Sequence, residues 1–210
     1  VATQNGTVVW ITPKCNVVGH AAGVTYSVAL NAGQSYDIEN VTNVANVAGQ
    51  NLSGTIIVSN KPISVTVTDD SVRGVSGCMD IMGDQIVPTE VVGTEYIINK
   101  GGLSAGEFEG AYIVATENFT QITINDGGIT NKILNKGDTY YYGTGQPLTY
   151  ITGDKPFYVI HASGFGCELG EAIIPPLNCA GSDQVSFTRT NTQTFILNIL
   201  CKTSAKGNFL

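Results

Sequence analysis

An internal repeat constrains this chain more than any other feature of its sequence. The motif Leu-Asn-x-Gly-x-x-Tyr begins at Leu30 and again at Leu134. Further along, a Lys-Pro pair at 61–62 matches a second pair at 155–156, and each pair opens an alternating apolar run. Self-similar motifs in a fixed order are the sequence signature of repeated structural units. We therefore predict that most of the chain consists of two related units.

The size of the repeat limits the architectures that the units can adopt. A unit of about 90 to 100 residues has the size of a β-sandwich domain and is about twice as long as a four-stranded propeller blade. We predict tandem, related β-sandwich-like units of antiparallel sheets, with a propeller-like arrangement of large blades as the alternative. The predicted units are residues 1–90, residues 91–180, and residues 181–210 as the start of a third unit or as closing strands.

Alternation of apolar and polar residues predicts the secondary structure. Residues 63–68 and 121–125 alternate in this way, as strands do when one face packs on a core and the other faces water. Clusters of Gly, Pro, Asn and Asp separate such runs, so we expect an all-β protein with almost no helix.

Since Pro fits the first residue of a strand, the register after each Lys-Pro places these side chains in the cores: Ile63, Val65, Val67, Phe157 and Val159. We expect Lys61 and Lys155 to be exposed at hairpin tips and not to bind ligand.

The charge balance argues against nucleic acid as a partner, and the length of the apolar runs argues against membrane insertion. The chain has 10 Lys and Arg residues against 17 Asp and Glu residues, which gives a net charge of −7. Without a basic cluster, nucleic acid is not an expected partner. Apolar runs reach only about seven residues, far fewer than a membrane helix needs, so we expect no membrane insertion.

The start at Val1 and the end soon after an apolar run at 195–200 lead us to expect a part of a longer chain or assembly.

Several motifs carry a resemblance to a known family. They are the two Lys-Pro runs and the segments at 83–88, 92–96, 112–120 and 134–138. In this order they are similar to the N-terminal domain of the IgG Fc-binding protein family, which also occurs in secreted, surface-attached bacterial proteins linked to adhesion and gliding. The resemblance implies an extracellular or cell-surface binding or adhesion module that recognises a protein or glycan ligand and is not an enzyme. The alternatives are a carbohydrate-binding or carbohydrate-active domain, and a structural spacer of a larger surface protein.

Catalytic motifs give no support to an enzyme. The sequence has no Gly-x-Ser-x-Gly, His-Glu-x-x-His or P-loop pattern, and the resemblance supplies no catalytic residue. A glycosidase needs two carboxyl groups in one cleft, and the acids available for such a pair are Glu107, Glu109, Glu168 and Glu171. His161 lies at the end of a strand pattern, where a packed or surface histidine is commoner than a general base.

Three consecutive tyrosines supply the candidate ligand-binding residues. Residues 140–142 are all Tyr, so two rings lie on one face of a strand and one on the other. Tyr36 occupies the repeat position of Tyr140, which favours packing for that ring. Tyr141 and Tyr142 have no aromatic counterpart in the first unit. We predict that these two bind ligand, because exposed Tyr anchors interfaces at low entropic cost.

A group of acidic residues is a candidate calcium site. Hard oxygen ligands that converge in a loop are what Ca²⁺ requires, and Asp69, Asp70, Asp80 and Asp84 lie close together in sequence. Their spacing matches no EF-hand loop. The favoured interpretation is therefore a solvated loop without a cofactor, with Asp side chains that hold turns.

The five cysteines show no Cys-x-x-Cys spacing, and Cys15 with His20 gives only weak support for zinc. The connection between Cys167 and Cys179 contains Gly and Pro and could fold back, so we predict this pair as the disulfide in an oxidising compartment. A bridge between the units through Cys78 and free buried thiols are the alternatives.

Overall fold

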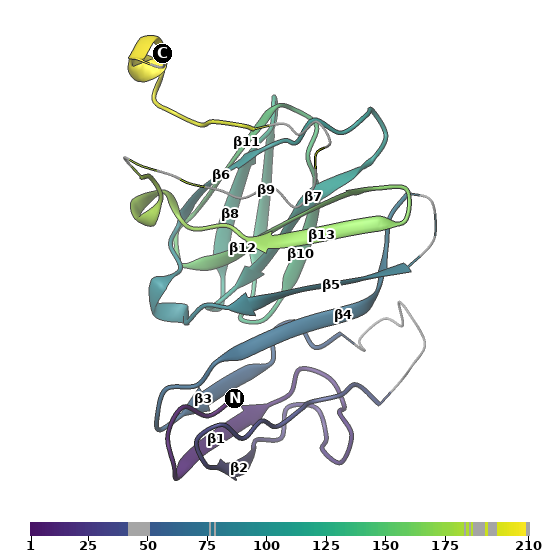
Figure 1. The fold of residues 1–210 in the computed structure, drawn as a ribbon, viewed down its shortest axis with the longest axis vertical. Helices are drawn as coiled ribbons and strands as arrows, with labels where there is room; N and C mark the ends of the chain where they lie inside the picture. Colours follow the sequence, from purple (N-terminus) through teal and green to yellow (C-terminus); the bar gives the residue numbers. More distant parts are fainter. Residues whose placement is uncertain are drawn as a thin grey trace.

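The computed structural model describes residues 1–41, 51–75, 77, 79–182, 184, 186, 192 and 197–208. Among these residues it has thirteen β-strands and three short 3-10 helices, and every strand pairing between them is antiparallel (Figure 1). The predicted all-β class with almost no helix is confirmed. The elements are β1 (Thr7–Thr12), β2 (Tyr26–Leu30), β3 (Ile56–Ser59), β4 (Val65–Arg73), β5 (Met79–Ile86), η1 (Thr89–Val91), β6 (Glu95–Asn99), β7 (Phe108–Ala115), β8 (Thr120–Asn125), β9 (Ile129–Leu134), β10 (Thr139–Gly143), β11 (Leu148–Gly153), β12 (Phe157–Phe165), β13 (Glu168–Ile173), η2 (Leu177–Cys179) and η3 (Thr203–Asn208).

Two four-stranded sheets make up the larger part of the fold, in the orders β10-β7-β12-β13 and β6-β11-β8-β9. Alternate side chains from both sheets meet in one buried cluster, which includes Tyr96 and Ile98 from β6, Ile113 from β7, Ile151 from β11 and Phe157 from β12. Since apolar residues of two facing sheets form this core, the arrangement is a β-sandwich and not the single sheet of a propeller blade.

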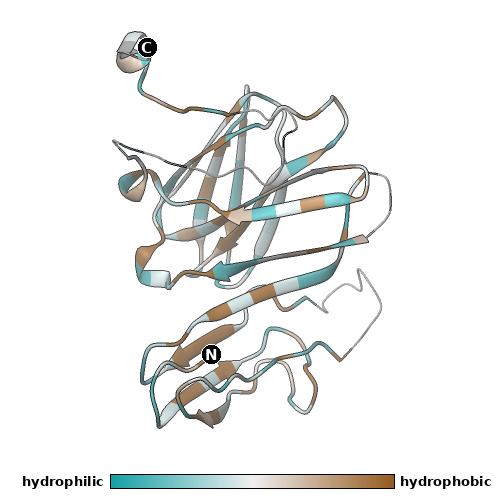
Figure 2. Cartoon of the chain, in the orientation of Figure 1, coloured by the Kyte–Doolittle hydropathy of each residue, from teal (hydrophilic) through white to brown (hydrophobic). Residues whose placement is uncertain are grey.

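The remaining strands form two smaller sheets, one with the order β2-β1-β3 and one with β4 and β5 alone. In Figure 1 the β1–β3 sheet lies at one end of the molecule, with the N-terminus, and β4 and β5 lie between it and the larger sheets. Along β1, Val9 and Ile11 are buried while Trp10 between them is exposed. Figure 2 shows the same alternation as bands of hydrophobic and hydrophilic colour along β4. The bands along β4 follow the alternation that the sequence predicts for residues 63–68, whereas β1 exposes an apolar side chain, Trp10.

The burial of the predicted core residues differs between the strands that follow the two Lys-Pro pairs. Phe157 and Val159 have no solvent exposure, which confirms their prediction. Ile63 and Val65 are only half-buried, and the prediction for Val67 is wrong, because 43% of its surface is exposed. Among the described strands β4 pairs only with β5, so it lacks the neighbouring strand that covers Val159.

The expected exposure of the two Lys-Pro lysines is also wrong, because both residues are half-buried. The Lys61 Nζ donates a hydrogen bond to the Asn5 carbonyl oxygen at 2.6 Å, and the Lys155 Nζ donates one to the Asn118 carbonyl oxygen at 2.5 Å. Each ammonium group thereby has a main-chain acceptor. Each lysine therefore fixes the turn that precedes β1 or β8.

Further hydrogen bonds recur at positions related by the repeat. The Thr3 hydroxyl donates to the Pro62 carbonyl oxygen at 2.7 Å, and the Thr116 hydroxyl donates to the Pro156 carbonyl oxygen at 2.5 Å. In the turn that follows, Gly6 has φ +64° and Phe119 has φ +57°. These matched contacts favour the two-unit interpretation, and the boundaries at residues 90 and 180 stay predictions.

Candidate functional site

The predicted ligand-binding tyrosines lie on opposite faces of β10. Tyr140 and Tyr142 pack against the buried core of the sandwich, whereas 41% of the Tyr141 surface is exposed. The Tyr142 hydroxyl donates to Oδ2 of Asp126 at 3.3 Å, and burial raises its pKa. The strand alternation therefore gives Tyr142 a role in the interior and leaves Tyr141 available to a ligand.

Tyr141 belongs to a cluster of three aromatic rings, which we call the aromatic face: Phe108, Tyr112 and Tyr141. The Tyr141 ring stacks on Phe108 with 5.8 Å between centroids and 8° between planes, and its centroid lies 5.0 Å from that of Tyr112. It lies over Gly110, where an added Cβ would come within 2.6 Å of the Tyr141 ring. The glycine therefore allows the ring to lie flat on β7.

Acidic groups lie near the aromatic face. Burial raises the pKa of the Tyr112 hydroxyl, and the charges of Tyr141, Asp69 and Glu171 contribute in the same direction. Burial also raises the pKa of Tyr141. Both phenols are neutral at physiological pH and available as hydrogen-bond donors beside the apolar rings. The face thus combines apolar area with polar groups, as protein-binding surfaces commonly do.

Two of the predicted calcium ligands instead bind main-chain amides. Asp80 and Asp84 lie on β5, and their Oδ2 atoms accept hydrogen bonds from the N–H groups of Leu169 at 2.7 Å and Ile173 at 2.9 Å in β13. Their Oδ1 atoms accept the N–H groups of the residues that follow them in β5. Each carboxylate therefore bridges two strands, and we call this contact the β5–β13 seam.

The other two acids, Asp69 and Asp70, lie on β4 beside an irregularity in its pairing with β5 between Asp69 and Val72. In the described part of the chain, no group of three or more His, Cys, Asp or Glu side chains is arranged to hold a metal ion. The four acids that the sequence grouped are thus divided between two strands, and two of them serve the seam.

The predicted disulfide between Cys167 and Cys179 is wrong. Cys179 is an exposed free cysteine in η2, whereas Cys167 is disulfide-bonded. β13 lies between the two cysteines in the chain, and its six residues span roughly 20 Å at about 3.3 Å per residue, while a disulfide needs Cα atoms within about 7 Å. The alternative bridge between the units involves Cys78, which lies outside the described residues. Cys15 is buried and free.

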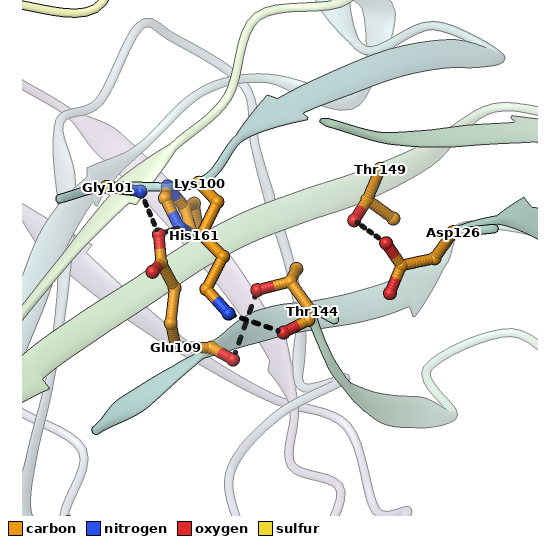
Figure 3. A network of polar contacts seen from close by, with 7 residues as sticks. All are labelled: Lys100, Gly101, Glu109, Asp126, Thr144, Thr149 and His161. Carbon is orange, nitrogen blue, oxygen red and sulfur yellow. Dashed lines mark hydrogen bonds and ion pairs between the residues drawn. The ribbon is translucent and has the colours of Figure 1, made fainter. Parts of the chain in front are cut away.

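A buried carboxylate forms a polar network within the sandwich (Figure 3). Glu109 lies on the core side of β7 and is 5% exposed. Its Oε1 accepts the Gly101 N–H at 2.6 Å and lies 3.0 Å from Nε2 of His161. The tautomer of His161 decides which of these two atoms donates. Oε2 of Glu109 has no hydrogen-bond partner, so the network is incompletely satisfied.

The same network ties two connecting segments to β7. The carbonyl oxygen of Glu109 accepts the N–H of Thr144 at 3.1 Å, and Nζ of Lys100 donates to the Thr144 carbonyl oxygen at 3.2 Å. Nearby, Asp126 accepts the N–H groups of Gly145 at 2.6 Å and Gln146 at 2.8 Å. These contacts order the loops at one end of the sandwich.

Sequence reasoning missed the roles of Glu109 and Asp126, although each left a signal. Glu109 occupies an inward position of an alternating strand, where a charged residue requires a buried partner. Asp126 precedes Gly127-Gly128, and Asp before a turn often accepts main-chain hydrogen bonds. Since the partners of both acids come from distant segments, the sequence could not name them.

Comparison with known families shows what the chain is related to. Its sequence matches the IgGFc binding protein family over residues 1–210. The chain belongs to this family. No curated protein and no solved structure matches it. The resemblance that the motifs carry is thereby confirmed.

Membership in the IgGFc binding protein family directs attention to the exposed side chains, because a binding protein meets its partner at the surface. The aromatic face meets this requirement, whereas Glu109 and the β5–β13 seam serve the interior. Among the described residues the structure contains no helix of the length and apolar character required to span a bilayer.

Proposed function

We propose that this chain is an extracellular or cell-surface binding and adhesion module without enzymatic activity, and that the aromatic face contacts a protein ligand. The observation that carries this proposal is the grouping of Phe108, Tyr112 and Tyr141 outside the core, with Tyr141 41% exposed. Tyr140 and Tyr142 on the same strand pack inward. The exposed ring is therefore a separate feature from the packing of β10.

The chemistry of the aromatic face suits a protein interface. Tyr offers a large rigid contact area and one polar group, and it loses little conformational entropy on binding because its side chain has few rotatable bonds. The face is already organised, because the Tyr141 ring is held between Phe108 and Tyr112 over Gly110. A preorganised surface loses less entropy on association. Glycan stacking on the same rings is the alternative, and a structural spacer would make no use of them.

The acidic residues support a non-enzymatic role. Glu109 and His161 contact each other and the main chain, and the Asp80 and Asp84 carboxylates bind strand amides. Glu171 lies near Asp84, which places it beside the β5–β13 seam. These groups therefore have structural partners that account for their positions.

Binding measurements with matched tyrosine variants test the proposal. The purified chain is titrated against immobilised IgG Fc fragment, the partner that the family name indicates, and is applied in parallel to a glycan array. Tyr141→Ala should weaken protein binding at least about tenfold, as expected for a central aromatic contact. Tyr150→Ala is the control, because Tyr150 is 37% exposed but lies on the opposite sheet.

The outcomes separate the alternatives. Equal binding by the two variants would contradict a role for the aromatic face. Array hits that Tyr141→Ala abolishes, without any Fc binding, would assign the face to a glycan. No binding in either format would favour the spacer.

A further inference from the structure

An open groove lies over β8 and β9, which are neighbours in the sheet β6-β11-β8-β9. Its volume is about 500 Å³, and pockets of roughly 300 to 1,000 Å³ are the usual sites of small ligands. The residues that line the groove are Gln121, Ile122, Thr123, Asn131, Lys132 and Ile133. Tyr141 lies on β10 in the other four-stranded sheet, so the groove is a surface separate from the aromatic face.

Strand register brings four side chains of the groove together on one face of the sheet. Gln121 lies opposite Ile133, and Thr123 lies opposite Asn131. Ile122, between the two β8 residues, is buried in the core, so alternation turns its neighbours and their cross-strand partners outward. Thr123 is half-buried and the other three are exposed. Three polar side chains and one apolar side chain therefore face solvent side by side.

Hydrogen bonds orient the polar side chains of the groove. The Thr123 hydroxyl donates to Oδ1 of Asn131 at 2.9 Å. This contact leaves the Nδ2 group of Asn131 as a donor and the lone pairs of the Thr123 oxygen as acceptors. Nε2 of Gln121 donates to Oδ2 of Asp154 at 3.4 Å, which leaves Oε1 of Gln121 as a further acceptor. The groove thus offers oriented donors and acceptors next to each other.

The groups that these side chains offer are uncharged. Lys132 carries the one formal charge among the six lining residues, and its Nζ lies 4.7 Å from the centroid of the Tyr140 ring, which packs against the core. The ammonium group is thereby held at that ring. Asp154 accepts the main-chain N–H of Gln121 at 2.7 Å and places a negative charge beside the groove. This balance disfavours an anionic ligand.

The predicted first unit shows that the fold does not require polar residues at this place. β1 pairs with β2 as β8 pairs with β9, and both β1 and β8 begin with a fully buried threonine. At the fourth residue of each strand, Trp10 lies opposite Ser27 in the first unit, where Thr123 lies opposite Asn131 in the second. The hydrogen-bonded pair is therefore a feature of this groove and not of the sheet.

We propose that the groove over β8 and β9 binds a neutral oligosaccharide. Neutral sugars carry hydroxyl groups, which both donate and accept hydrogen bonds, together with apolar C–H faces. The Nδ2 donors of Asn131 and the acceptors of Thr123 and Gln121 suit these hydroxyl groups, and a few oriented polar groups are enough to fix a ligand in a site. Ile133 is 68% exposed and offers apolar surface to a C–H face.

A further side chain would extend this site along the sheet. Tyr150 of β11 lies opposite Asn125 of β8 and is 37% exposed. Its hydroxyl donates to Oε1 of Glu95, which holds the ring in place. An exposed Tyr ring has an apolar body on which a sugar can stack. The site therefore has room for more than one sugar ring, and it is additional to the protein contact proposed above.

Two substitutions remove the polar groups and keep the side-chain size. Thr123→Val replaces the hydroxyl with a methyl group, and Asn131→Leu replaces the amide with an apolar group of similar volume. Each should weaken the binding of a neutral oligosaccharide at least about fivefold, because hydrogen bonds to the ligand are lost. Ser27→Ala is the matched control, since Ser27 occupies the position in the first unit that Asn131 occupies in the second. It should leave binding unchanged.

An array of neutral, sialylated and sulfated oligosaccharides, applied to the full chain, provides the first measurement. The chain should bind neutral members, and this binding should be the same at low and high salt because no ion pair forms. Titration of the isotope-labelled chain with the strongest neutral member should then shift the side-chain NMR signals of Asn131 and Gln121. Binding should persist in Tyr141→Ala and weaken in the two groove variants, and circular dichroism melts check that each variant is folded.

Failure to bind any neutral oligosaccharide would overturn the proposal. So would a preference for sulfated members, NMR shifts confined to residues outside β8, β9 and β11, or unchanged binding by the folded groove variants. Binding that Tyr141→Ala abolishes while Thr123→Val keeps it would assign the sugar to the aromatic face instead. Binding of the Fc fragment by the groove variants is a separate readout and should be unchanged, so failure of this proposal is distinguishable from failure of the proposed function.

Discussion

The carboxylate of Asp84 accepts the backbone N–H of Ile173 at 2.9 Å and thereby joins β5 to β13. Asp80 makes the equivalent contact with Leu169 at 2.7 Å. In each pair the acid and the residue whose N–H it accepts are 89 positions apart in the sequence. Because this separation is the same for both pairs, β5 and β13 run in the same direction along the seam. The outward N–H groups of an edge strand promote unwanted pairing, and here side-chain oxygens satisfy two of them.

The seam should contribute measurably to stability. Removal of the Asp84 carboxylate leaves the Ile173 N–H without its charged acceptor, so Asp84→Ala should lower the free energy of unfolding by about 1.5 to 3 kcal/mol. Urea denaturation followed by fluorescence measures the change. Glu168→Ala, at an exposed position on β13, should stay within about 0.5 kcal/mol. Equal effects of the two substitutions would show that the seam adds no stability.

The seam also predicts a pH dependence. Burial, followed by the charges of Asp84 and Asp69, raises the pKa of Glu171 above its ordinary value of 4.5. The folded state therefore binds a proton more readily than the unfolded chain, so this group disfavours folding as pH rises through the raised pKa. Glu171→Gln should stabilise the protein at pH 7 by less than about 1 kcal/mol, because the carboxyl group is only partly buried.

Thermal melts of Glu171→Gln and the unmodified protein between pH 3 and pH 8 provide the measurement. The difference should vanish at the acidic end, where the carboxyl group is protonated in both states. A stabilisation that is the same at every pH would point to a packing effect and contradict the electrostatic cause.

The buried Glu109 should be sensitive to truncation. Glu109→Ala removes the acceptor of the Gly101 N–H and the hydrogen-bond partner of His161, and should lower the unfolding free energy by about 1 to 3 kcal/mol. Glu109→Gln keeps one acceptor oxygen and adds donors, so its loss should be smaller. Chemical denaturation ranks the two variants. If Ala is tolerated as well as Gln, the network of Figure 3 is not what orders these loops.

Two glycines form a close contact between the predicted units. Gly54 has φ +89°, and a Cβ added there would lie 2.2 Å from the Gly137 carbonyl oxygen. Gly54→Ala should therefore destabilise the protein by about 2 kcal/mol or more, through backbone strain together with a main-chain clash. Gly128→Ala is the control, because no atom lies within 4 Å of its added Cβ. Similar melting temperatures for the two variants would contradict this packing.

Local patterns predicted the strands well because alternation reports directly on which face of a strand is buried. The register after Lys155-Pro156 is confirmed by the complete burial of Phe157 and Val159. The same reasoning failed at Val67, because burial there depends on a neighbouring strand and not on the pattern of β4 itself. A repeat in sequence implies equivalent strands, but it does not guarantee equivalent neighbours.

The functional residues were harder to predict because they depend on contacts between distant segments. Tyr141 and Tyr142 are the same type of residue. Only the alternation of side chains along β10 makes one ring exposed and packs the other against the core. Asp80 and Asp84 resemble metal ligands in sequence, yet their partners are amides 89 residues away. Cys167 and Cys179 are close in sequence, and the extended β13 between them keeps them apart.

Amide hydrogen exchange of the full chain with and without its bound protein ligand tests the central claim most directly. The account predicts slower exchange in β7 and β10, which carry Phe108, Tyr112 and Tyr141, with little change in β8 and β9 of the opposite sheet. Protection confined to β8 and β9, with β7 and β10 unchanged under saturating ligand, would contradict the assignment of the aromatic face as the binding surface.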